Sequence, residues 1–157
     1  MGVVLPNLIT IIVLTITLII CAYTDFTKET ISPIILCSCL AIETGIRFLV
    51  YRDHDWVNSL LGAIIGFGVF FVLAVASKGG GGDALLMGTL GWCVGLYNFA
   101  CVFVLTSGCY LLFFIGKAII AKTQHTSMKE ILQAQYPYAP FVLFGWIIFL
   151  LIGIFGG

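Results

Sequence analysis

Long apolar runs separated by short polar segments make up almost the whole chain. A helix needs about 20 mainly apolar residues to cross a hydrocarbon core about 30 Å thick. The pattern predicts six membrane-spanning helices, at residues 8–23, 31–50, 56–77, 83–99, 100–121 and 138–155. The runs are apolar on all sides and lack the alternation of membrane barrel strands. We therefore expect an all-α polytopic membrane helix bundle, in a single domain over residues 1–157.

The fourth and fifth apolar runs are almost continuous. At about 1.5 Å per residue, residues 83–121 are too long for one crossing of the bilayer. We therefore expect two helices joined by a tight turn near Tyr97 and Asn98.

Composition agrees with a membrane protein. Of the 157 residues, 61% are hydrophobic and only 9% are charged, against about 45–50% and about 25% in soluble domains. Such a chain cannot cover the surface of a soluble enzyme with polar groups. Seven Lys and Arg balance seven Asp and Glu, so the chain has no basic excess for a nucleic acid. The six cysteines form no CxxC pair, and we expect no metal site or other cofactor.

The basic residues predict the orientation of the bundle. Five lysines lie in or beside the first, third and fifth loops, whereas Arg47 and Arg52 lie toward the other side. The lysines are Lys28, Lys78, Lys117, Lys122 and Lys129. Because basic residues favour the cytoplasmic side, we expect these loops in the cytoplasm of an inner-membrane protein, with both termini outside. The start of the chain lacks a basic region and a cleavage site, so we expect a retained first helix.

Two spacings predict contacts inside the bundle. Gly62 and Gly66, like Gly91 and Gly95, are four residues apart, which favours close helix packing. Glu43 also precedes Arg47 by four residues, which favours an ion pair on one helix face. A substrate contact or a proton-relay role is the alternative for Glu43.

Asp25 and Asp83 are the candidate catalytic residues. Asp25 follows the first apolar run and Asp83 begins the fourth, so both lie toward the same predicted cytoplasmic face. Either carboxylate alone could be an interfacial residue or a helix cap. As a pair in a chain with so few charges, they indicate a functional site.

Four glycines precede Asp83: Gly79, Gly80, Gly81 and Gly82. Such a run cannot remain a stable helix, and irregular backbone at membrane depth needs protein or a wet cavity around it. We expect this loop to position Asp83 at a cavity edge. A phosphate-binding loop would need Gly-Lys-Ser/Thr after the glycines, whereas Lys78 precedes them.

Two neighbouring carboxyl groups can hydrolyse a peptide bond without a covalent intermediate. They share one proton, so the ionised group takes a proton from water while the protonated group polarises the carbonyl. A nucleophilic Ser or Cys would need a histidine partner. His54 lies toward the opposite predicted face and His125 lies in the long loop, so neither offers one.

The residues around both carboxylates resemble a known family. Gly80-Gly81-Gly82-Asp83 matches the Gly-x-Gly-Asp signature of intramembrane aspartyl proteases. The continuation to Trp92, and Asp25 followed by Ile31 and Pro33, resemble type IV prepilin peptidases. The segment Tyr136-Pro137-Tyr138-Ala139-Pro140-Phe141 resembles the start of that family's last helix.

The resemblance implies an aspartic endopeptidase that removes leaders from prepilin-like precursors at the cytoplasmic membrane face. Such substrates carry a basic leader joined to an apolar helix, which would lie in the bilayer beside the bundle. Tyr23, Thr24, Lys28 and Lys78 flank the two carboxylates and are candidates to orient them or to contact substrate.

The sequence departs from the family pattern in three ways. Ile31-Ser32-Pro33 stands where the family has Ile-Pro-Asn, and Leu85 stands where it often has Lys. A cation there would favour an ionised Asp83. The paired CxxC motifs of the family's methyltransferase region are also missing from the sequence, so we expect a peptidase-only form.

A small proton- or ion-coupled transporter is the rival interpretation, with Asp25, Asp83 and Glu43 as a relay. A relay would distribute carboxylates along the bilayer depth, whereas Asp25 and Asp83 share one predicted level. A purely structural membrane subunit would explain the glycine pairs but would leave the run of four glycines without a role.

Overall fold

The computed structural model describes residues 7–28, 30–50, 55–77, 81–123 and 137–155. These residues form helices and no strands. The helices are α1 (Leu8–Lys28), α2 (Pro33–Val50), α3 (Trp56–Ser77), α4 (Gly82–Thr123) and α6 (Ala139–Phe155). The prediction of an all-helical chain is confirmed.

Among the described residues, three helices are long and apolar enough to cross a membrane: Leu8–Lys28, Trp56–Ala76 and Gly82–Ile119. The apolar helix α6 is shorter, at 17 residues, and α2 carries a buried charged pair. The structure therefore does not show the six separate spans that the sequence predicts. The finding is consistent with a membrane helix bundle, because large apolar side chains point outward along every helix, as lipid contact requires.

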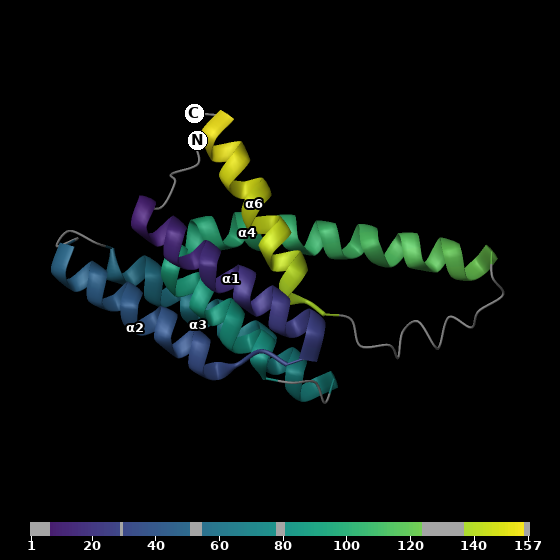
Figure 1. Ribbon diagram of the computed structural model, residues 1–157, viewed down its shortest axis with the longest axis horizontal. Coiled ribbons are helices and arrows are strands. Elements are labelled where there is room, and N and C mark those ends of the chain that lie inside the picture. The colour runs from purple at the N-terminus through teal and green to yellow at the C-terminus, as the bar shows by residue number, and fades with distance from the viewer. Residues whose placement is uncertain (1–6, 29, 51–54, 78–80, 124–136, 156–157) are drawn as a thin grey trace.

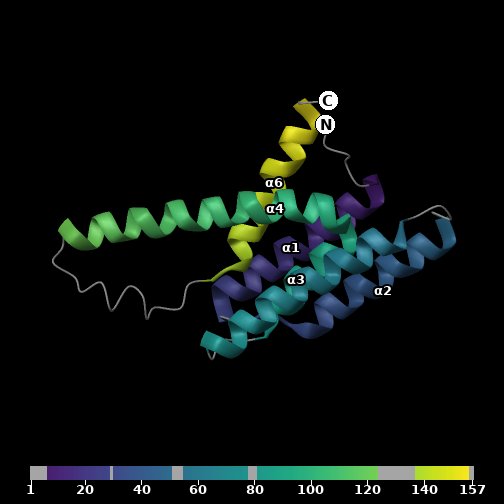
Figure 2. The same ribbon diagram turned by 180° about the vertical axis from the view of Figure 1, so that it is seen from behind.

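The predicted fourth and fifth helices form a single element, α4, which is interrupted at Gly95. Gly95 has φ 77° and ψ 165°, a backbone conformation that glycine adopts and other residues avoid. The break lies two residues before the predicted turn at Tyr97 and Asn98. Figures 1 and 2 show a first limb beside α3 and a second limb that crosses α6 and leads away from α1, α2 and α3. We call residues 82–94 and 96–123 the first and second limbs of α4.

Polar side chains bind the backbone groups that the break releases. The Arg47 guanidinium donates to the Cys93 carbonyl, and the Asn98 amide donates to the Val94 carbonyl at 3.1 Å. The Asn58 amide oxygen accepts the Leu96 N–H at 3.0 Å. Because lipid offers no hydrogen bonds, irregular backbone needs such partners at membrane depth. Arg47 and Asn58 therefore tie α2 and α3 to the break.

The predicted Glu43–Arg47 ion pair is confirmed. Glu43 Oε1 accepts a hydrogen bond from Arg47 Nε at 3.0 Å and another from Thr10 Oγ1 at 2.6 Å. Arg47 also donates to Ser59 Oγ at 2.7 Å. All four side chains are buried, so one polar network joins α1, α2 and α3 to the break in α4.

Glycines bring α3 and the first limb of α4 into backbone contact. A Cβ atom on Gly62 would lie 2.5 Å from the Gly91 carbonyl oxygen, and one on Gly91 would overlap the Gly62 carbonyl. Gly66 approaches the Met87 carbonyl in the same way. The predicted packing role is confirmed for Gly62, Gly66 and Gly91, whereas Gly95 forms the break in α4.

The packed core lies between α1, α2, both limbs of α4 and α6. Leu14, Leu18, Leu36, Leu90 and Trp146 are each 1% exposed or less. Figure 1 shows α6 crossing both α1 and the second limb of α4. The core therefore fixes the end of α1 against the beginning of α6.

We predict that Gly62→Ala destabilises the protein by about 1–3 kcal/mol, because the added methyl group meets backbone that cannot turn aside. Gly68→Ala is the matched control on the same helix, since nothing lies within 4 Å of its added Cβ atom. That change should leave stability unchanged or raise it by up to about 1 kcal/mol. Thermal unfolding of both variants in detergent tests this, and equal midpoints would contradict the packing role.

Candidate active site

Asp25 lies in the last turns of α1 and is buried. Its Oδ2 atom accepts a hydrogen bond of 2.9 Å from the backbone N–H of Ala139, the first residue of α6. The two residues are 114 positions apart along the chain. The carboxylate therefore binds one of the N–H groups that the start of a helix leaves without an internal partner.

Asp83 lies in the first turn of α4 and is half-buried. The preceding Gly82 allows α4 to begin close to Ile31, because a Cβ atom at position 82 would lie 3.1 Å from the Ile31 Cβ. Gly81 accepts the Leu85 N–H at 3.2 Å and closes the first turn. The last two glycines of the run thus lead directly into the helix that carries Asp83.

The structure brings the two carboxylates to the same end of the bundle. Figures 1 and 2 both place the last turn of α1 beside the first turn of α4. Asp25 lies in the last turns of α1 and Asp83 in the first turn of α4. The two candidate residues therefore belong to helix ends that lie side by side.

Tyr138 stands directly before α6 and joins that helix to α3 and α4. Its ring centroid lies 5.4 Å from that of Phe70 on α3 and 5.7 Å from that of Tyr110 on α4. Its neighbour Ala139 binds Asp25, so the aromatic contacts of Tyr138 hold the start of α6 next to that aspartate.

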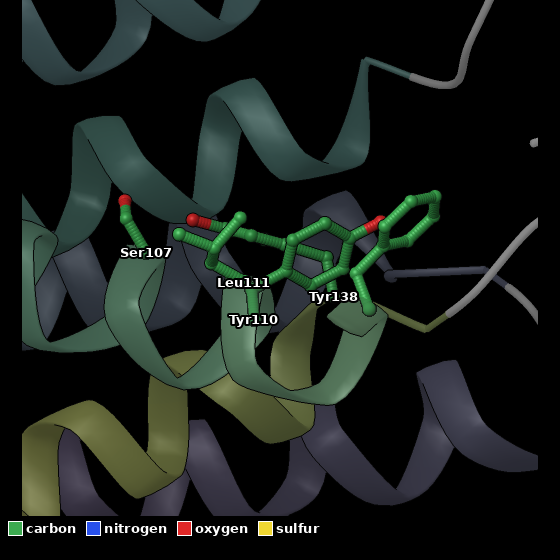
Figure 3. A pocket seen from close by; sticks show the side chains of 5 residues that line it. Ser107, Tyr110, Leu111 and Tyr138 are labelled. Carbon is green, nitrogen blue, oxygen red and sulfur yellow. The ribbon is translucent and has the colours of Figure 1, made fainter. Parts of the chain in front are cut away.

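A pocket of about 460 Å³ opens beside Tyr138. Tyr138 closes one side of it, and residues from the second limb of α4 form the rest (Figure 3). These residues are Ser107, Tyr110, Leu111 and Phe114. Its size and mainly apolar lining are those of a site for an apolar group.

The other predicted site residues are three that flank Asp25 and three that precede Asp83. Tyr23 and Lys28 are exposed on α1, and Thr24 donates within its own helix to the Cys21 carbonyl at 3.1 Å. Lys78, Gly79 and Gly80 lie outside the described residues. Within the described ranges, no three His, Cys, Asp or Glu side chains are arranged to hold a metal ion.

Sequence reasoning did not assign Tyr138, Ala139 or the pocket residues to the site. Prolines on both sides of Tyr138 and Ala139 are a signal for the start of a helix. That signal marks where α6 begins, but it does not identify Asp25 as the partner of the new helix. The pocket has no sequence signal, because its residues belong to an ordinary apolar run.

Comparison with known proteins gives one family match. The chain matches the type IV leader peptidase family over residues 12–157. No curated protein and no solved structure matches the chain.

Proposed function

The chain belongs to the type IV leader peptidase family, and on that premise we propose that it is a membrane-embedded aspartic endopeptidase. Membership of the family implies a protease that acts on prepilin-like proteins. The observation that carries the proposal is that the end of α1, which carries Asp25, lies beside the start of α4, which carries Asp83. The whole of residues 1–157 would form one peptidase domain.

In the proposed reaction, Asp25 and Asp83 form a general acid–base pair that activates water. The ionised carboxylate accepts a proton from water while the protonated carboxyl group donates to the carbonyl oxygen of the scissile bond. The half-burial of Asp83 and the burial of Asp25 support this role, because limited access to bulk water strengthens their interaction. The glycine run before Asp83 would fix its position.

The substrate would be a prepilin-like precursor with a basic leader and an apolar helix. In the inner membrane its helix would lie in the bilayer beside the bundle, and the scissile bond would reach the level of the two aspartates. The lysine distribution supports a site near the cytoplasmic face, with both termini outside. Tyr23 and Lys28 are exposed beside Asp25, so both could contact the leader, with Thr24 and Lys78 as further candidates.

The pocket next to Tyr138 supports a substrate site at the same place. It is lined largely by apolar side chains of the second limb of α4 and by Tyr138, and Ala139, the residue after Tyr138, binds Asp25. An apolar part of the precursor bound there would hold the adjoining peptide bond against the carboxylates.

The contacts of Glu43 favour the peptidase over the transporter interpretation. Glu43 bonds to Arg47 and Thr10, within the network that supports the break in α4. A charge fixed by an ion pair in a structural network is poorly suited to pass protons between Asp25 and Asp83.

We predict that Asp25→Asn and Asp83→Asn each lower cleavage at least 100-fold, because an amide cannot exchange a proton as a carboxyl group does. Leader removal from a co-expressed, tagged prepilin-like precursor measures the effect. Asp55→Asn is the control: Asp55 caps α3 through the Asn58 N–H at 3.1 Å, and that variant should still cleave. Normal processing by either of the first two variants would refute the pair.

We predict that Leu111→Trp raises KM by roughly tenfold with little change in kcat, since the larger ring fills the pocket. Leu112→Trp introduces the same ring at a neighbouring, exposed position that does not line the pocket. Steady-state cleavage of a purified precursor by the two variants tests the substrate site. Equal KM values for both variants would show that substrate does not use the pocket.

We predict that a cysteine placed at Ser127 is shielded from an impermeant thiol reagent added to intact cells. A cysteine placed at Asp53 should be labelled under the same conditions, because the two positions lie on opposite predicted faces. Both are made in a variant whose native cysteines are replaced by alanine and which still accumulates in the membrane. Labelling at position 127 alone would show that the orientation is the reverse of the proposed one.

A further inference from the structure

We propose that the two aspartates have fixed and different roles: Asp25 is the ionised base and Asp83 carries the shared proton. The assignment rests on the proposed peptidase function. It follows from a difference in hydrogen bonding: Asp25 accepts a backbone N–H, whereas the Asp83 carboxyl group has no donor among the described residues.

The partner of Asp25 is a backbone N–H group, which can only donate. Tyr138 accepts the N–H groups of Phe141 and Val142 at 3.0 and 3.3 Å, so α6 begins immediately after it and Ala139 occupies the first helical position. The Ala139 N–H is therefore free to donate to Asp25 Oδ2. The positive end of the helix dipole lies at the same point. Both effects stabilise the carboxylate form of Asp25 more than the protonated form.

The surroundings of Asp83 can accommodate a proton. Asp83 lies in the first turn of α4, beside the end of α1 that carries Asp25. Among the described residues, its carboxyl group receives no hydrogen bond. Because Asp83 has no donor to lose, it can carry the shared proton at a lower cost in hydrogen bonding than Asp25. The first turn of α4 favours negative charge on Asp83, but the helix end at Asp25 acts through a direct hydrogen bond.

Other groups near the pair do not reverse this difference. Cys21, one turn before Asp25 on α1, is a buried thiol close enough to sense the charge of Asp25. Lys28 is exposed at the end of α1. Neither residue provides a fixed donor to one aspartate, so the Ala139 N–H remains the feature that distinguishes the two.

The assignment gives a balanced reaction. Asp25 removes a proton from water as the water oxygen bonds to the carbonyl carbon, and Asp83 passes its proton to the carbonyl oxygen. In the resulting diol the C–N bond then breaks, and the nitrogen receives the proton held by Asp25. One diol hydroxyl returns its proton to Asp83. The products are a carboxylic acid and an amine, and both aspartates regain their starting forms.

Replacing Ala139 tests the assignment. Ala139→Pro removes the N–H at the first helical position, where proline is well tolerated. Ala139→Val is the matched control, because it adds a side chain of similar size and keeps the N–H. Cleavage of a purified precursor is measured as kcat/KM against pH for the wild type and both variants. The acidic limb reports protonation of the base, and the alkaline limb reports loss of the proton from the acid.

We expect Ala139→Pro to move the acidic limb upward by about one pH unit, because the carboxylate form of Asp25 loses its donor. The alkaline limb should stay in place, and Ala139→Val should resemble the wild type. An upward shift of the alkaline limb alone would mean that Asp25 is the acid, which overturns the assignment. Unchanged limbs in Ala139→Pro would overturn it as well.

A second measurement covers the case in which Ala139→Pro does not accumulate. Infrared spectra of Asp83→Asn protein with isotope-labelled aspartate should show no protonated aspartate at pH 7, because Asp25 remains ionised. A protonated carboxyl band from Asp25 at that pH would refute the assignment. The proposed function fails separately, if the wild type does not cleave the precursor or if Asp25→Asn cleaves it normally.

Discussion

An apolar bundle must provide a partner for every backbone group that leaves a helix, and most of the polar residues described here meet this requirement. The break at Gly95 exposes the carbonyls of Cys93 and Val94 and the N–H of Leu96. Arg47, Asn98 and Asn58 bind these groups in turn. The start of α6 exposes the N–H of Ala139, which Asp25 binds. The same constraint thus shapes the scaffold and the candidate active site.

The contacts at the Gly95 break and the candidate active site are connected through α4. The break allows the second limb to depart from the direction of the first, and that limb carries the residues that line the pocket. Aromatic rings then fix the second limb against α6: Tyr110 and Phe113 both pack on Phe141, at 5.2 and 5.1 Å between ring centroids. The position of the pocket beside Tyr138 therefore depends on a network at the opposite end of the first limb.

Much of the helical layout could be predicted from hydrophobic runs, because each run is long and bounded by charged or glycine-rich segments. The Glu43–Arg47 contact was also predictable, since four residues within one helix fix the geometry. The break at Gly95 was not, because glycines four residues apart indicate close packing and a helix interruption equally well. Asp25 and Asp83 could be recognised as a pair by their shared predicted face. The bond from Asp25 to Ala139 could not, because it joins residues that only the folded chain brings together.

Contacts with the backbone make unequal demands on their two partners. Cys93, Leu96 and Ala139 each contribute a main-chain group that almost any amino acid provides, whereas Arg47, Asn58 and Asp25 each contribute a specific side chain. Replacement at the first three positions is limited mainly by volume, and at the last three by chemistry. Among related chains, substitution should therefore occur independently at the two ends of each contact. Pairs of residues that are joined by these contacts would then show few correlated substitutions, although the contacts hold the bundle together.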